Sequence, residues 1–495
     1  MNKARPGKTS VLVHYLRYLG GNLMIIAAGF VSFPIMTRLL DNHQFGILGY
    51  YEAWLLVIAG LLKLGAQHAI LRFYPHQGGA IALRRFRTDY LLLPFALSML
   101  LWLVCAAVVV LTLQRIPTAE QPILWVLVIT LPLMIWSSFV EAIMYALERS
   151  DISLWLKTIW RWSELALVML TIAMIERSAL GVFSARLVVL VVVAAWLTLW
   201  FHRWCRGRLI RPSRAPILAG MTFGVPMMFT ELVSVLFGFA DRILLRALTG
   251  SFTEVGIYTI GYGLAMAVSA VLGRTLSEAF LPTALRLYKT HGAKAVVELK
   301  REMLDLWMLV VGLATALLLC VGQDFLVLLA GQDKAASAPV FVAISIAMVW
   351  GSLIAIAQYG LLLQRKALRV LAITMAATAM NLALNIPLIM AFGVSGAVAA
   401  TLVSYVFLAI LQLWQCPAEL RYLPPLGRVL GAASFGPIVW VVLLQLNYFG
   451  ADAPASRLLA GGFTVLVPAL GLAALDRKLH ASIVRVLRAR TRPES

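Results

Sequence analysis

The sequence predicts an all-α polytopic membrane protein with about 14 transmembrane helices, arranged as two pseudo-symmetric six-helix bundles plus a C-terminal helix pair. Three observations lead to this fold class. Apolar residues make up 61% of the chain and charged residues 13%, against roughly 45–50% and about 25% in soluble domains. Apolar runs of about 20 residues, enough to cross a hydrocarbon core of about 30 Å, recur over the whole length. Short sequence patterns also recur between the two halves.

Each apolar run is interpreted as a helix, because a bilayer requires every backbone amide to be satisfied within its own segment. The runs cover residues 19–37, 47–70, 89–113, 121–147, 152–175, 179–201, 217–245, 255–282, 303–322, 338–363, 368–391, 395–415, 429–447 and 457–475. The loops between them are short. The predicted external loops, such as 41–45 and 331–337, are too small to hold a catalytic domain.

The internal repeat is visible in three places. Its matching segments are 71–74 with 285–288, 181–185 with 393–397, and 38–47 with 246–257. One nearly constant offset of 208 to 214 positions indicates that the chain consists of two similar halves. In a membrane protein this layout is typical of a transporter whose site lies between the halves.

The repeat also defines the domains that we expect. Residues 1–201 form the N-terminal six-helix bundle and residues 217–415 the C-terminal one, with a basic cytoplasmic linker at 202–216 between them. Residues 416–476 form the additional helix pair and residues 477–495 a basic cytoplasmic tail. Apolar residues recur at helical spacing in that tail, which fits either an amphipathic helix on the membrane surface or a solvated tail.

The net charge of +20 is explained by membrane topology. Most Lys and Arg residues fall on the loops of one side, among them 71–88, 202–216 and 283–302, and on both termini. The positive-inside rule makes that side cytoplasmic, with both termini inside. The scatter over many loops argues against a nucleic-acid partner, and the linker charges indicate contact with anionic membrane lipids.

Several kinds of chemistry have no sequence signature here. The four cysteines (Cys105, Cys205, Cys320 and Cys416) contain no short-spaced pair, which favours neither a disulfide framework nor a metal site. The chain has no nucleotide-binding Gly-x-x-x-x-Gly-Lys-Ser/Thr segment and no serine nucleophile elbow. We therefore expect no cofactor, no metal and no catalytic residue. Transport would run on an ion gradient, the membrane potential or consumption of the product.

Two cations stand at matching depths of the two halves. An ionisable group in the bilayer costs from roughly 3 to over 10 kcal/mol, so it normally faces a partner or a wet cavity. Lys63 lies in the second span and Arg274, 211 positions later, in the eighth. Both facing the centre would give a cationic cavity suited to a diphosphate. The alternative is local pairing, of Arg274 with Glu278 and of Lys63 with nearby carbonyl groups.

Other intramembrane charges are further candidates. Arg17 and Arg186 are either inward-facing phosphate ligands or snorkelling side chains. Arg242, with the neighbouring Asp241, either completes the rim of the cavity or bridges two helices.

A buried carboxylate could instead couple transport to protons. The candidates for this role are Glu164, Glu141 and Asp241. Glu164 also lies three residues after Arg161, a spacing at which the two side chains could neutralise each other.

Family motifs extend over nearly the whole chain. They are Gly21-Asn22, the segment 33–40 (FPIMTRLL), Phe45-Gly46, Ala240-Asp241-Arg242, the segment 255–258 (VGIY) and the segment 393–397 (GVSGA). In these motifs the chain resembles the polysaccharide transporter family of the multidrug/oligosaccharidyl-lipid/polysaccharide (MOP) flippase superfamily. The resemblance implies two bundles around a cationic cavity, with Lys63 and Arg274 similar to the cavity cations.

The resemblance also implies a function. A polyprenyl-diphosphate-linked glycan, namely an O-antigen, capsule or exopolysaccharide repeat unit, would cross the bacterial cytoplasmic membrane by alternating access. A polysaccharide polymerase and chain-length machinery would be partners. Two alternatives stay open: another cargo on the same fold, either the peptidoglycan lipid precursor or a cationic drug, and a membrane polysaccharide polymerase or ligase. Drug exporters usually have twelve spans and acidic cavities, so the additional helix pair and the cations Lys63 and Arg274 argue against a drug as cargo. Membrane polymerases usually need a sizeable external loop, and none is predicted here.

Overall fold

The computed structural model describes residues 24, 27–76, 79–147, 150–204, 210–364, 366–445, 461, 462 and 465. Within these ranges, the side chains of residues 80, 150, 151, 204, 271–279, 282, 354, 355, 357, 358, 367, 444 and 445 are outside the description. The described residues form helices and connecting turns, with no β-strand among them. Ten of the helices are long and apolar enough to cross a membrane, and the predicted fold class is confirmed.

The chain divides into two compact units, residues 1–246 and 247–495. This boundary follows packing contacts, whereas the bundle boundary at 202–216 follows the sequence repeat. The duplication boundary therefore stays a prediction.

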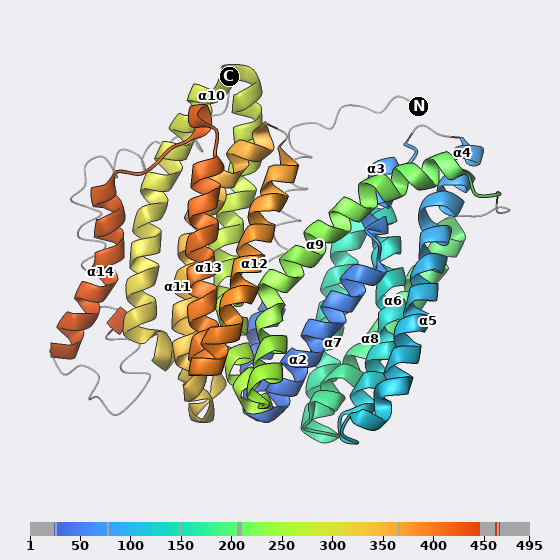
Figure 1. Cartoon of the computed structure of the whole chain (residues 1–495), viewed down its shortest axis with the longest axis horizontal. Helices are drawn as coiled ribbons and strands as arrows, with labels where there is room; N and C mark the ends of the chain where they lie inside the picture. The colour runs from blue at the N-terminus through green and yellow to red at the C-terminus, as the bar shows by residue number, and fades with distance from the viewer. Residues whose placement is uncertain are drawn as a thin grey trace. The chain divides into compact units, whose positions relative to one another are not determined.

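The first unit begins with an apolar helix over Ala27–Leu39. Its other elements are α2 (Asn42–Leu62), α3 (Ala66–Phe73), α4 (Ala80–Phe86), the π-helix η1 (Arg87–Leu92), α5 (Leu93–Thr112), the 3-10 helix η2 (Leu113–Arg115), α6 (Gln121–Ala146), α7 (Ser150–Met174), α8 (Ala179–Trp204) and α9 (Arg214–Thr249), which runs just past the unit boundary (Figure 1). Fully buried side chains of α6, including Ile135, Phe139 and Ile143, form the centre of its apolar core.

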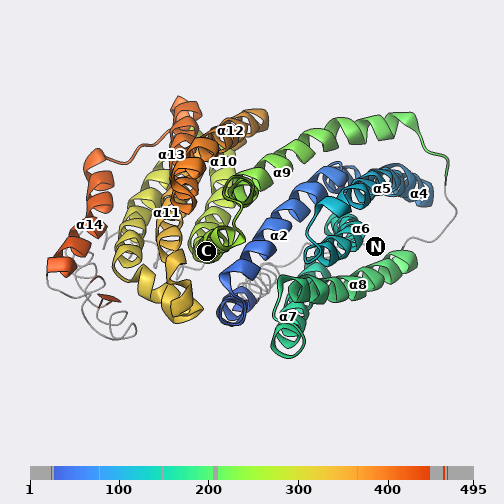
Figure 2. The same ribbon diagram turned by 60° about the horizontal axis from the view of Figure 1, so that its bottom comes forward.

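The second unit contains α10 (Phe252–Ala330), η3 (Gln332–Ser337), α11 (Ala338–Leu363), α12 (Ala367–Phe392), α13 (Val394–Gln415), η4 (Ala418–Leu420) and α14 (Leu426–Gln445). Figures 1 and 2 show α11, α12 and α13 side by side. The 79 residues of α10 are two helices that meet at Gly292, whose φ of 76° and ψ of −167° are not helical. The predicted spans 255–282 and 303–322 lie on either side of that kink. The last predicted span, 457–475, falls almost wholly outside the described residues.

The predicted second span, 47–70, is interrupted. α2 ends at Leu62 and α3 starts at Ala66, and between them Leu64 and Gly65 adopt left-handed φ angles of 54° and 68°. Hydropathy does not detect this break, because Lys63, Gln67 and His68 lie among apolar residues and the run as a whole is still long enough to span a membrane. The break meets α9 closely, since a Cβ added to Gly65 would lie 1.9 Å from the carbonyl oxygen of Gly224. Figure 2 shows α9 running along α2.

This contact predicts that Gly65→Ala destabilises the protein by more than about 2 kcal/mol. An L-residue in the left-handed conformation costs roughly 1–2 kcal/mol, and the overlap with Gly224 adds to that. Gly60→Ala is the matched control: it lies in α2, and nothing stands within 4 Å of its added Cβ. Thermal unfolding in detergent should show a large fall in Tm for the Gly65 variant only. Equal Tm values for the two variants would contradict the close approach.

Candidate functional site

The interruption of the second span places Lys63 at the end of α2, where it is the C-terminal capping residue. Its Nζ lies 2.5 Å from Oε1 of Glu231, which projects from α9. The side chain of Lys63 is only 12% exposed and that of Glu231 27%. The intramembrane cation is thus compensated by a carboxylate of the same unit.

Two residues at the start of α3 approach the other oxygen of the same carboxylate. Gln67 Nε2 donates a hydrogen bond to Glu231 Oε2 at 2.5 Å, and His68 Nε2 lies 3.5 Å from that oxygen. We call Lys63, Gln67, His68 and Glu231 the Glu231 cluster. Because Lys63 ends one helix and Gln67 and His68 begin the next, the cluster attaches both sides of the break to α9.

A second group of charges links α2, α7 and α8. Arg186 of α8 lies 3.4 Å from Glu52 of α2 and 3.0 Å from Glu164 of α7. Arg161 lies 3.2 Å from Glu164, so the pairing that their three-residue spacing allows is present. Two guanidinium groups and two carboxylates balance one another. Arg186 is engaged by protein groups here.

Glu141 is less firmly held than Glu164. Lys157 Nζ, on α7, lies 3.5 Å from Glu141 Oε2, on α6. That ammonium also lies 5.1 Å from the centre of the Tyr145 ring. The side chain of Glu141 is 15% exposed and that of Lys157 38%. The pair therefore joins a largely buried carboxylate to a more solvent-exposed ammonium.

Asp241 and Arg242 lie in the described part of α9 and are almost inaccessible, with exposed fractions of 0% and 3%. Arg242 donates a hydrogen bond to the carbonyl oxygen of Gly238 at 2.9 Å. Its guanidinium also stands over the Phe239 ring, 4.7 Å from the centroid. Both side chains are therefore packed into the protein and expose little surface to a ligand.

The remaining two candidates fall outside the description. Arg17 is outside the described residues, and Arg274 lies in α10 where side chains are not described. A cavity shared by Lys63 and Arg274 therefore stays a prediction.

Sequence reasoning missed the Glu231 cluster. Gln67 stands four residues after Lys63, and Glu231 was visible as an intramembrane acid. The cluster depends on the contact between the break and α9. In the sequence, only Gly65 and Gly224 indicate that contact. Among the described residues, no group of three or more His, Cys, Asp or Glu side chains could hold a metal ion.

Comparisons with known proteins agree with this architecture. The family described as polysaccharide biosynthesis protein matches residues 13–287, more than half of the chain. The chain belongs to this family. No curated protein matches it.

The solved structures that share the fold of this family member include a flippase and a multidrug transporter. A lipid II flippase MurJ in an inward closed conformation is 12% identical, with 92% of this chain and 98% of that chain covered and a TM-score of 0.73. An inward-facing multidrug resistance MATE family transporter of the MOP superfamily is also 12% identical, with 85% and 99% covered and a TM-score of 0.63. The fold of this multi-pass membrane protein is thus shared with flippases and transporters, and the family resemblance seen in the sequence is confirmed.

The Glu231 cluster predicts strong energetic coupling between Lys63 and Glu231. In a cycle of Lys63→Met, Glu231→Leu and the double variant, the coupling in the free energy of unfolding should be about 1–3 kcal/mol. Each single variant leaves one charge uncompensated in a poorly hydrated site. The same cycle on Lys157 and Glu141 is the control. It should give less than about 1 kcal/mol, because the two charged groups are farther apart and the lysine is more solvent-exposed. Unfolding in detergent measures both, and zero coupling at Lys63 would contradict the cluster.

Proposed function

We propose that this protein is a flippase that moves a polyprenyl-diphosphate-linked oligosaccharide across the bacterial cytoplasmic membrane by alternating access. The cargo would be an O-antigen, capsule or exopolysaccharide repeat unit, and both termini would be cytoplasmic. Family membership and the shared flippase fold support the proposal. The observation that carries it is Lys63, a cation kept inside a span at the point where the helix is interrupted.

Interrupted helices are where duplicated transporters build their binding sites. The break supplies a place where a charged side chain can leave one partner for another without unfolding a continuous helix. Lys63 is held in the span by Glu231. A diphosphate offers the same kind of partner, a polyanion that accepts charge-assisted hydrogen bonds. Binding would therefore be an exchange, in which substrate phosphate replaces the carboxylate beside Lys63.

Such an exchange gives the substrate a means of changing conformation. A ligand shifts an equilibrium only if it binds one state more tightly than the other. While Glu231 occupies Lys63, the break is fixed to α9. Once phosphate takes Lys63, Glu231 keeps only Gln67 and His68, and α3 is held less firmly. The state with the cluster open would then be the state that the substrate favours.

The other proposed ligands can be ranked. Arg274 ranks first, as the counterpart of Lys63 in the repeat, and Arg17 second. Arg186 and Arg242 come last, because protein groups already engage both. Anionic membrane lipids, a polysaccharide polymerase and chain-length machinery complete the proposed partners.

One alternative cargo is favoured by a specific observation. The fold is shared with a protein named as a lipid II flippase, so a peptidoglycan lipid precursor is the second candidate. It would use the same Lys63 exchange, and only the glycan would differ.

The proposal predicts that Lys63→Ala and Arg274→Ala each reduce the appearance of lipid-linked glycan in the outer leaflet by about 10-fold or more. A charge-assisted hydrogen bond contributes roughly 1.5–3 kcal/mol, and every 1.4 kcal/mol is tenfold. Lys63→Arg keeps the cation and should retain most of the activity. The measurement is leaflet-resolved detection of the glycan at equal protein levels in the membrane.

Lys294→Gln is the control for this assay, since it removes an exposed lysine of α10 that lies outside the proposed site. Its export should stay close to that of the unaltered protein. Undiminished export in the Lys63→Ala/Arg274→Ala double variant would remove the charge-based mechanism and leave the fold assignment standing. If the double variant exported O-antigen-type glycan normally but no longer transported lipid II, the result would favour the alternative cargo.

If transport is coupled to protons, we propose Glu141 as the coupling residue in preference to Glu164 and Asp241. A coupling carboxylate must gain and lose its proton during the cycle. Glu164 contacts two guanidinium groups, at 3.2 and 3.0 Å, and Asp241 is fully buried, whereas Glu141 has a single lysine partner at 3.5 Å.

This order predicts that Glu141→Gln abolishes the response of transport to an imposed pH gradient. Glu164→Gln should instead lower thermal stability, because it leaves two guanidinium groups with a single carboxylate. Transport into vesicles with and without the gradient measures the first effect. A Glu141→Gln variant that keeps the full response to pH would assign the coupling elsewhere.

A further inference from the structure

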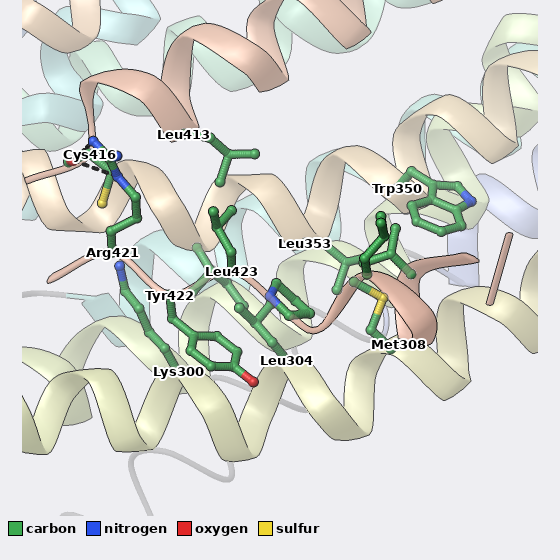
Figure 3. A pocket seen from close by; sticks show the side chains of 14 residues that line it. Lys300, Leu304, Met308, Trp350, Leu353, Leu413, Cys416, Arg421, Tyr422 and Leu423 are labelled. Atoms are coloured by element: carbon green, nitrogen blue, oxygen red, sulfur yellow. Dashed lines mark hydrogen bonds between the residues drawn. The ribbon is translucent and has the colours of Figure 1, made fainter. Parts of the chain in front are cut away.

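The second unit contains a groove with a volume of about 430 Å³, lined by 14 residues (Figure 3). It lies between the second half of α10, α11, the end of α13 and the segment 416–426, which leads from α13 to α14. The volume is within the range of roughly 300–1,000 Å³ that is typical of ligand sites. All of its lining belongs to one unit.

The wall formed by the segment 416–426 is fixed to α10 by polar contacts. Lys300 Nζ donates a hydrogen bond to the carbonyl oxygen of Leu420 at 2.8 Å. Tyr422 donates to Asp305 at 3.2 Å, and Arg428, at the start of α14, forms an ion pair with the same carboxylate. The groove is therefore a formed part of the fold and not a gap beside a loose loop.

One end of the groove is cationic. Figure 3 shows Lys300 and Arg421 together there. Arg421 donates to the carbonyl oxygens of Trp414 and Cys416, each at 2.8 Å. Both cations thus contact carbonyl oxygens, which carry no compensating charge. None of the 14 described lining residues is acidic.

The imbalance is unusual for a side chain as buried as Lys300, which is 1% exposed. A buried ammonium normally has a carboxylate partner, as Lys63 does in the first unit. The nearby Asp305 is taken up by Arg428 and Tyr422. Lys300 Nζ has three donors, and one hydrogen bond, to Leu420, is observed. The site has the charge and the donors to receive an anion.

The rest of the groove is apolar. Its walls include Leu304, Met308, Trp350 and Leu353, which Figure 3 shows extending away from the cationic end. At its edge, Leu423 and Leu426 are 58% and 71% exposed, as side chains that face hydrocarbon would be. A ligand that fits must therefore carry an anionic group at one end and a hydrocarbon chain behind it.

We propose that this groove binds an anionic glycerophospholipid of the membrane, with its phosphate at Lys300 and Arg421 and one acyl chain along the apolar walls. Basic pockets between transmembrane helices on the cytoplasmic side are typical sites for such headgroups. The segments 283–302 and 416–428, which carry Lys300 and Arg421, belong to the side that the sequence predicts to be cytoplasmic. A lipid-linked glycan fits less well, because the aromatic donors of the lining already contact protein groups: Tyr422 donates to Asp305 and Trp350 to Thr315.

The bound lipid would join α10 to the connection between α13 and α14, since its phosphate would contact one cation from each. It would supply from the membrane the negative charge that the described lining residues do not provide. This site is independent of the proposed transport function.

The test measures binding of phosphatidylglycerol and phosphatidylcholine, with identical acyl chains, to the full-length protein in neutral detergent by native mass spectrometry. We expect phosphatidylglycerol to bind at least about 10-fold more tightly. Lys300→Gln and Arg421→Gln should each weaken its binding about 10-fold. Arg421 is exposed, so its variant should fold even if that of the buried Lys300 does not. Lys294→Gln, an exposed cation of α10 outside the groove, should bind as the unaltered protein does.

A third variant tests the apolar part. Leu353→Trp fills the groove and leaves both cations in place, so it should weaken lipid binding without changing the preference for an anionic headgroup. Equal affinity for the two lipids would overturn the proposal, as would an equal loss in Lys294→Gln. Tighter binding of a polyprenyl diphosphate than of phosphatidylglycerol, lost in Arg421→Gln, would also overturn it by assigning the groove to the cargo.

Discussion

A charge inside a bilayer must be compensated by a neighbouring group, and this constraint decides how the first unit is assembled. The Lys63–Glu231 pair joins the break between α2 and α3 to α9, and the contacts of Arg186 join α8 to α2 and α7. In hydrocarbon the hydrophobic effect does not drive helices together, because lipid tails are as apolar as leucine. Paired charges are selective, since an unpaired one costs several kcal/mol. The ion pairs therefore help to select which helices of this unit pack together.

The same constraint limits how the proposed site can work. If Lys63 were left uncompensated to await a substrate, its desolvation would weigh against the folded protein. A resident carboxylate removes that cost, but the substrate must then compete with it. Competition lowers the affinity and gives the binding step a structural consequence, because releasing Glu231 also loosens α3. The glycines allow this arrangement: with no side chain at Gly65 or Gly224, the break can lie against the backbone of α9, near enough for a contact of 2.5 Å.

The predictability of these features depends on whether their causes are local. Helix length and apolar character are local properties, so the runs in the sequence identified the helices and the fold class. The break at Gly65 was missed, because glycine is frequent in continuous membrane helices and its φ angle is set by tertiary contacts. The kink at Gly292 falls in the loop predicted between the spans 255–282 and 303–322. The importance of Lys63 followed from the cost of a buried charge. Its partner Glu231 did not, since 168 residues separate them and only packing brings them together.

The contrast between Lys63 and Lys300 follows from where each amine lies. Both are nearly buried, yet one contacts a carboxylate and the other a carbonyl oxygen. A lysine within a span has only the protein to neutralise it, so a partner must be encoded elsewhere in the chain. A lysine at the predicted cytoplasmic edge is within reach of phosphate headgroups, whose negative surface attracts basic side chains by roughly 1 kcal/mol per residue. For Lys300 and Arg421, an encoded carboxylate would exclude the lipid phosphate. The lack of acidic side chains among the described residues of that groove therefore leaves room for a lipid phosphate. The same lack around Lys63 would leave its charge uncompensated inside the span.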